Sequence, residues 1–311
     1  MRSFPLAIIV FILTVLSAAA QTKPDFYRVN PDRSSEYERI GASADAGGGI
    51  DVVELNNSGI KVAMGGDFGR ASKIFRDLIG EIPLSFEAHY NLGISLAAAG
   101  RYDEAVQYLI YATELNARSI NAHIALGHTY FKLDDFNKSA REFRRTLDLA
   151  PRDFVSANDL AVALFRSGET AAAVAAINES LRLKSDFPDA LNNRGMMLHS
   201  LGRYKEARDD FRNAILVRPL FPEAHNNLGA TLTALGKRKE AYKSFEEAVR
   251  LRANWAEAIY NLAISCLNLG KRDDARKHLK SLEPLNSELA TKLGKEFERA
   301  YVIEAPKAVE N

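Results

Sequence analysis

A long pattern occurs repeatedly in this chain at a fixed distance. Residues 192–207 read NNRGMMLHSLGRYKEA, and residues 226–241, 34 positions later, read NNLGATLTALGKRKEA. The same step finds YNLGISLAAAGRYDEA at 90–105 and YNLAISCLNLGKRDDA at 260–275. A fixed period of this length predicts a stack of structural repeats, because each copy repeats a packing contact. Seven units, without insertion or deletion, begin at residues 52, 86, 120, 154, 188, 222 and 256.

The residues that recur in every unit have packing roles. Small side chains at unit positions 8 and 20 allow two helices to approach closely, and position 24 carries a large apolar side chain that fills the space between them. Position 15 is Gly in six units and Asp134 in the third, as expected for a helix that ends in the left-handed conformation. Each unit therefore predicts a helix of about 13 residues, a tight turn and a second such helix.

This pattern resembles the tetratricopeptide repeat family, whose 34-residue unit has small residues, Leu, Gly, aromatic residues, Ala and Pro at these positions. The resemblance covers residues 52 to about 289. It implies an all-α fold, a right-handed α-solenoid (superhelix) of seven helix-turn-helix units. Two departures predict altered local packing within that fold. Arg194 replaces a buried Leu, and Thr170, Arg238 and Arg272 replace the aromatic residue of position 17.

The pattern divides the chain into segments. The repeats occupy residues 52–289, as 52–85, 86–119, 120–153, 154–187, 188–221, 222–255 and 256–289. Residues 287–304 carry apolar residues at helical spacing and predict a capping helix with a polar outer face, which a repeat stack requires. Ser287 is the predicted N-cap of that helix. Residues 21–51 are polar and predict a flexible linker, and residues 305–311 form a tail.

Residues 1–20 predict a secretory signal peptide. Arg2 precedes an apolar run at 4–16, and Ala18-x-Ala20 offers a cleavage site before Gln21. A membrane-anchoring segment is the alternative, although the run is shorter than the roughly 20 residues that a span needs. The single cysteine, Cys266, excludes an internal disulfide framework and falls at a buried helical position. We therefore expect an exported bacterial protein, periplasmic or secreted, with no stable membrane span after signal cleavage.

Composition and motifs argue against catalysis. With 41 basic and 40 acidic residues, the chain offers no basic footprint for nucleic acid. No glycine-rich phosphate loop precedes a Lys-Ser/Thr pair, and no histidine has a partner at metal-binding spacing. His89, His123 and His225 share unit position 4, which predicts a repeated packing contact. The sequence thus predicts a protein that is not an enzyme and needs no metal or cofactor.

The resemblance implies that the first helix of each unit lines a concave groove through positions 2, 5, 6, 9, 12 and 13. Asparagine recurs at two of these positions, and an amide can pair with both N–H and C=O of an extended peptide. The candidate groove residues of this kind are Asn57, Asn91, Asn192, Asn193, Asn226, Asn227 and Asn261. The alternative is that asparagine at position 6 belongs to the family pattern and serves packing.

The middle units present another residue type at the same positions. Aromatic and Arg side chains dominate binding hot spots, although packing between units is the alternative role. These candidates are His128, Phe131, Lys132, Phe165, Arg166, Met196 and His199. Position 2 is acidic in several units and predicts a rim that repels anions. No unit carries a basic residue at positions 2, 5 or 6, so the carboxylate capture used by chaperone-binding members of the family is disfavoured.

These observations predict a scaffold that binds a protein or an extended peptide in its concave groove, in the cell envelope. An assembly factor for a secretion or pilus machine is one alternative. A binder of a small molecule or glycan in the groove is another. The identity of the partner, the oligomeric state and the type of envelope stay open.

Overall fold

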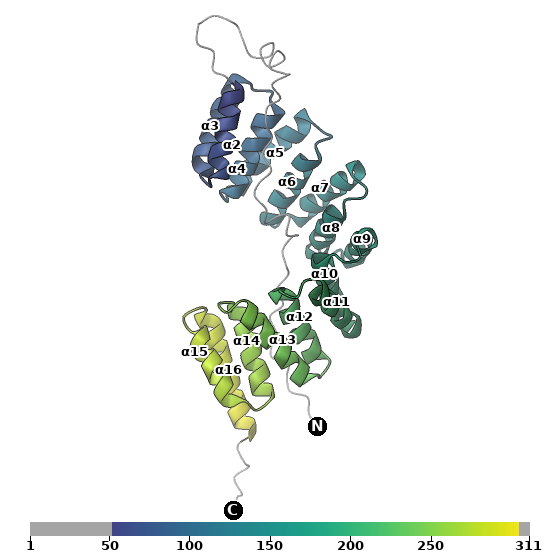
Figure 1. The fold of residues 1–311 in the computed structure, drawn as a ribbon, viewed down its shortest axis with the longest axis vertical. Helices are drawn as coiled ribbons and strands as arrows, with labels where there is room; N and C mark the ends of the chain where they lie inside the picture. Colours follow the sequence, from purple (N-terminus) through teal and green to yellow (C-terminus); the bar gives the residue numbers. More distant parts are fainter. Residues whose placement is uncertain (1–51, 305–311) are drawn as a thin grey trace, which may run out of the picture. The chain divides into compact units, whose positions relative to one another are not determined.

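A computed structural model describes residues 52–304 of the chain (Figure 1). This region is all α-helical, with seven helix pairs and a further helix, as predicted. It falls into two compact parts, the N-terminal part (residues 52–183) and the C-terminal part (residues 184–304). The predicted signal peptide, linker and tail lie outside the described residues.

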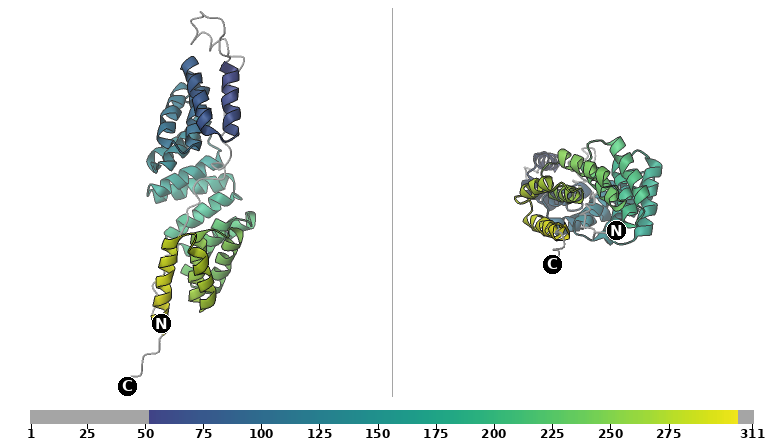
Figure 2. Two further views of the ribbon diagram at one scale, coloured as in Figure 1. Left: turned by 90° about the vertical axis from the view of Figure 1, so that its left-hand side faces the viewer. Right: turned by 90° about the horizontal axis from the view of Figure 1, so that it is seen from below.

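Consecutive helices pack against one another within each part, as Figure 2 also shows. The helix pairs of the N-terminal part are α2 (Val52–Met64) with α3 (Phe68–Glu81), α4 (Phe86–Ala98) with α5 (Tyr102–Leu115), α6 (Ile120–Lys132) with α7 (Phe136–Leu149), and α8 (Phe154–Arg166) with α9 (Thr170–Leu183). The C-terminal part contains α10 (Pro188–Ser200) with α11 (Tyr204–Val217), α12 (Pro222–Ala234) with α13 (Arg238–Leu251), α14 (Ala256–Asn268) with α15 (Arg272–Leu282), and α16 (Ser287–Glu304).

The two helices of a unit are held together by the contact between positions 8 and 24. A Cβ added to Gly195 would lie 2.8 Å from the ring of Phe211, and one added to Gly93 would lie 2.6 Å from Leu109. Real Cβ atoms do not approach so closely, so only glycine or a shifted partner fits at these two places. Phe211 and Leu109 are fully buried. The close approach that the small residues predict is therefore confirmed.

The turn inside each unit requires the left-handed backbone conformation. Six glycines at position 15 have φ between 73° and 89°. Asp134, at the same position of the third unit, has φ 56° and is the one non-glycine residue with positive φ among the described residues. A side chain in this conformation is strained, because its Cβ approaches the neighbouring carbonyl oxygen.

We expect the substitution Asp134→Gly to raise the free energy of unfolding by about 0.5–1 kcal/mol, because it removes this strain. The Asp134 carboxylate lies 3.5 Å from Arg166 but is 76% exposed, so losing that ion pair should cost little. Gly202→Ala is the matched control and should lower stability by about 1 kcal/mol. Urea-induced unfolding followed by circular dichroism measures both; a loss of stability in Asp134→Gly would contradict the account.

Helix α16 covers the end of the repeat stack. Leu293 is buried, and Leu289 and Phe297 pack on the core formed by α14 and α15. Asn286, rather than the predicted Ser287, caps this helix, since its Oδ1 accepts a hydrogen bond from the Leu289 N–H at 3.0 Å. The helix spans Ser287–Glu304, the predicted range, and the cap lies one residue earlier than predicted, so that Ser287 is the first helical residue. The apolar end of the last unit is thus shielded from water, as the capping role requires.

Candidate functional site

The asparagines of the first helices form hydrogen bonds between neighbouring units. The position-6 amide of one unit donates to the position-5 amide oxygen of the preceding unit in three places. These bonds join Asn91 to Asn56 at 3.0 Å, Asn227 to Asn192 at 3.1 Å, and Asn261 to Asn226 at 2.9 Å. All six side chains are buried. We call this set the amide ladder.

The amide ladder has the packing role that the sequence analysis left open. A buried amide that bonds to the next unit fixes the register of the stack, and leaving it unpaired would cost free energy. Asn193 is buried as well, whereas Asn57, in the first unit, is exposed. Direct contact between any of these asparagines and a partner peptide stays a prediction.

The ladder is interrupted in the middle of the N-terminal part. Position 6 is Ala125 in the third unit and Asp159 in the fourth. The buried Asp159 carboxylate accepts a hydrogen bond from Asn158 at 3.0 Å and lies 3.5 Å from Nε2 of His128. Burial, assisted by the charge of Lys132, lowers the pKa of His128 to about 4. The imidazole is therefore neutral at pH 7, and its contact with Asp159 is not an ion pair at that pH.

This lowered pKa predicts a loss of stability in mild acid. The unfolded chain takes up a proton on His128 near pH 6.5, whereas the folded ring does so only near pH 4. Stability should therefore fall as the pH drops from 6.5 to 4, by about 2–3 kcal/mol from this group. Between pH 7 and pH 4.5, the free energy of unfolding of His128→Asn should therefore fall by about 2–3 kcal/mol less than that of the wild type. Urea unfolding at both pH values measures this difference. An equal loss in both proteins would show that His128 is not the cause.

The aromatic candidates of the third and fourth units are divided between packing and surface. Phe131 is buried, and its ring meets that of Phe136 edge-on at 5.1 Å. The guanidinium of Arg166 lies 4.5 Å from the centre of the Phe136 ring. Phe131 thus packs within the third unit, and the guanidinium of Arg166, from the fourth unit, lies 5.6 Å from the centre of its ring. Phe165 and Arg166 remain half-buried, and Lys132 is exposed.

The remaining candidates of the fifth unit, Met196 and His199, lie in the C-terminal part. Met196 is buried, and half-buried His199 places Nδ1 3.0 Å from Oγ1 of Thr231. That hydroxyl donates its proton to the backbone carbonyl of Asn227, so Nδ1 must carry the hydrogen and donate it to Thr231. Burial lowers the pKa of His199 to about 4. His199 is thus a neutral ring that ties the fifth unit to the sixth.

The acidic rim predicted at position 2 is neutralised in two units of the C-terminal part. Arg218 binds both carboxylate oxygens of Asp189, at 3.0 and 2.8 Å, and stacks over the ring of Phe221. Arg252 pairs with Glu223 and stacks over Trp255 in the same way. Sequence reasoning missed these pairs, although both arginines share unit position 31. The expected repulsion of anions is therefore wrong for this part of the rim.

The histidines at position 4 serve packing, as their repetition predicts. His89 Nε2 lies 2.9 Å from the carbonyl oxygen of Pro83, and His225 Nε2 lies 3.1 Å from that of Pro219. Among the side chains that the structure describes, those of residues 52–298, no group of three or more from His, Cys, Asp or Glu could hold a metal ion. Within residues 52–304, no helix is both long and apolar enough to cross a bilayer.

Comparison with known proteins places these features in a family. The family model described as "Tetratricopeptide repeat" matches residues 65–117, 124–186, 158–225 and 200–258, which together are more than half of the chain. Tetratricopeptide repeat protein 6 of Homo sapiens is 26% identical over 157 residues, 49% of this chain and 30% of that protein. The peroxisomal targeting signal receptor of Kluyveromyces lactis is 28% identical over 109 residues, 35% of this chain and 19% of that protein.

A solved structure shows the same fold over most of the chain. A tetratricopeptide repeat protein from Parabacteroides merdae superposes with a TM-score of 0.67 at 17% identity, covering 79% of this chain and 98% of that one. By contrast, the chain matches less than a third of the length of each of the two curated relatives.

Proposed function

We propose, because this chain belongs to the tetratricopeptide repeat family, that it is a protein-binding scaffold that holds an extended segment of a partner protein along its first helices. The name of the Kluyveromyces lactis relative describes a receptor for a targeting signal, which supports recognition of peptide segments.

One observation carries this proposal. The residue type at the buried unit positions that hold each helix pair together is the same or similar in all units, whereas the residue type at accessible positions varies from unit to unit. Positions 8 and 20 hold small residues in all seven units, because they fix the helix pairs. Position 13 holds a different residue type in each unit, except that two units share Ala. These residues are Met64, Ala98, Lys132, Arg166, Ser200, Ala234 and Asn268. A side chain that the stack does not need is free to specify a partner.

The N-terminal part offers the strongest binding surface of this kind. Lys132 is exposed, and Phe165 and Arg166 are half-buried at the ends of α6 and α8. Aromatic and cationic side chains of this type contribute most to binding at protein interfaces. We therefore assign partner binding to these three residues.

The proposed location is the cell envelope or the exterior. It rests on the sequence of residues 1–20, whose apolar run and Ala18-x-Ala20 site are typical of a cleaved secretory signal. The intact mass of the exported protein tests this directly. A chain that begins at Gln21 would support export, and retention of residues 1–20 in a membrane fraction would indicate an anchor instead.

The binding proposal is tested by capturing the partner from the native envelope by crosslinking and then measuring its affinity for purified variants. Phe165→Ala should weaken binding by about 10–30-fold, as for a hot-spot aromatic residue. Lys132→Glu should also weaken binding, whereas Lys73→Glu, an exposed charge reversal on α3, should not. Wild-type affinity in both Phe165→Ala and Lys132→Glu would refute the assignment.

A thermal-shift screen separates this proposal from a small-molecule or glycan carrier. A ligand that binds only the folded state raises the melting temperature by mass action. We expect no stabilisation by small metabolites or oligosaccharides and a clear rise with the captured partner. Stabilisation by a small ligand alone would favour the carrier.

A further inference from the structure

Unit position 17 carries an aromatic ring in four units and lacks one in the fourth, sixth and seventh. In the third and fifth units, this ring packs against an aromatic side chain at position 12 of the first helix. Phe136 meets Phe131 at 5.1 Å, and Tyr204 meets His199 at 4.8 Å between ring centres. The sixth unit has Arg238 at this position. A long, charged side chain cannot pack there as a ring does.

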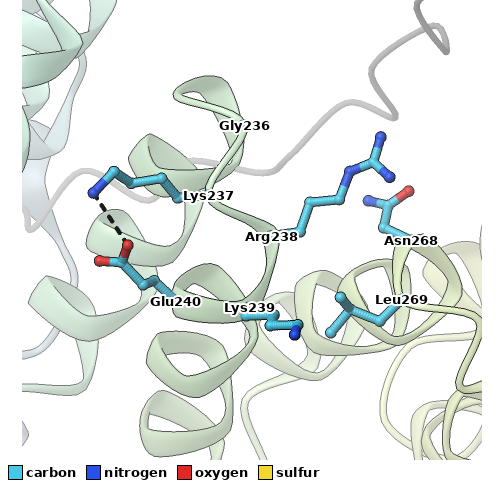
Figure 3. A pocket seen from close by; sticks show the side chains of 7 residues that line it. All are labelled: Gly236, Lys237, Arg238, Lys239, Glu240, Asn268 and Leu269. Carbon is cyan, nitrogen blue, oxygen red and sulfur yellow. Dashed lines mark hydrogen bonds and ion pairs between the residues drawn. The ribbon is translucent and has the colours of Figure 1, made fainter.

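An open hollow of about 510 Å³ lies at this place in the C-terminal part. The turn between α12 and α13 forms one side, and the end of α14 forms the other. Figure 3 shows the side chains of Arg238 and Asn268 close together, with Lys237 turned away toward Glu240. The lining residues are Gly236, Lys237, Arg238, Lys239, Glu240, Asn268 and Leu269.

The charge of this hollow is not balanced within the C-terminal part. Its one acidic residue, Glu240, is shared by two cations, Lys237 at 3.1 Å and Arg212 at 3.0 Å. Among the described residues, Arg238 and Lys239 have no carboxylate within ion-pairing distance, and both are exposed. The corresponding turn of the second unit has the equivalent ion pair, Arg101 with Glu104, but carries Tyr102 and Asp103 where the sixth unit has Arg238 and Lys239. The sixth unit therefore presents two uncompensated cations beside an unfilled space.

We propose that this hollow is a docking site for an acidic segment of a partner protein. The charge complementarity favours carboxylates, which Arg238 can bind through two parallel N–H···O bonds and Lys239 as a point charge. The Asn268 amide can donate to a backbone carbonyl or a carboxylate of the same segment. This site uses none of the residues assigned to partner binding in the N-terminal part, so either proposal can fail alone.

The probe is a rhodamine-labelled ten-residue peptide of alternating Glu and Gly, with a Gln-Gly peptide as control, measured by fluorescence anisotropy on the whole mature protein. We expect the Glu peptide to bind at low ionic strength and to weaken as salt is added, because exposed charges are screened. Arg238→Glu with Lys239→Glu should weaken binding at least about tenfold, through loss of two charge-assisted contacts. Equal binding of the Glu and Gln peptides would overturn the proposal.

Two further variants separate the site from general charge effects and from misfolding. Lys205→Glu with Lys280→Glu changes the net charge equally at two exposed positions elsewhere, and its affinity should stay within about twofold of wild type. Arg238→Tyr restores the aromatic residue of position 17, so it should fill the hollow, keep or raise the melting temperature and weaken peptide binding, because the two N–H···O bonds of the guanidinium are lost while Lys239 remains. Wild-type affinity in Arg238→Tyr, or an equal loss in the Lys205/Lys280 control, would overturn the proposal.

Discussion

Replacing Arg194 by Leu should lower the free energy of unfolding by about 2–4 kcal/mol, although Leu is the residue that five other units carry at this position. Arg194 binds the Asp210 carboxylate through Nε and Nη2, each at 2.7 Å. The Asp210 side chain is 7% exposed and that of Arg194 28%. The substitution therefore leaves a buried carboxylate without its cation, and that penalty exceeds the gain from burying an apolar side chain.

The sixth unit supplies the control for this prediction. It has Leu228 and Ser244 where the fifth unit has Arg194 and Asp210. The double variant Arg194→Leu with Asp210→Ser places these sixth-unit residues in the fifth unit. Its free energy of unfolding should lie within about 1 kcal/mol of the wild-type value, since no buried charge remains. Urea unfolding of the two single variants and the double variant forms a complete cycle. A double variant as unstable as Arg194→Leu alone would contradict the account.

Removing two rungs of the amide ladder should also be costly. Asn227→Ala with Asn261→Ala removes the donors that Asn192 and Asn226 accept from, at 3.1 and 2.9 Å. Leaving buried amide oxygens without these donors costs about 1–3 kcal/mol each. Alanine is the better helix former by less than 1 kcal/mol per residue, so local propensity does not offset the loss. We expect a total loss of about 2–5 kcal/mol.

The matched control is Asn57→Ala, the exposed position-6 asparagine of the first unit. Its stability should change by no more than about 0.5 kcal/mol. Thermal unfolding followed by circular dichroism compares the two proteins. If the double variant kept wild-type stability and instead lost its affinity for the partner, the amides would serve peptide binding rather than the stack.

The fold could be predicted because its decisive contacts lie within one unit. Gly195 and Phe211 are 16 residues apart, and the same spacing returns in every unit, so periodicity alone locates the helix pairs. The same periodicity identifies Asp134 as the one residue other than glycine at position 15, where the turn requires the left-handed conformation. The sequence also identified Arg194 as a departure from the pattern.

The roles of the candidate site residues could not be predicted in the same way. Whether the Asn227 amide faces a groove or Asn192 depends on the rotation between successive units, which no local pattern specifies. The pairs Arg194–Asp210 and Arg218–Asp189 likewise join positions whose proximity follows only from packed helices. The sequence shows that Arg238 replaces an aromatic residue. The hollow beside it could not be predicted, because its other side is formed by Asn268 and Leu269 of the next unit.

The central claim is that the repeated residues hold the stack while the variable, accessible residues of the first helices bind a partner. Site-specific photo-crosslinking in the native envelope tests this most directly, with the crosslinking residue at position 165 on α8 or at position 73 on α3. We predict that position 165 captures a defined protein partner and that position 73 does not. Capture of the same proteins from both positions, or none from position 165, would contradict the account.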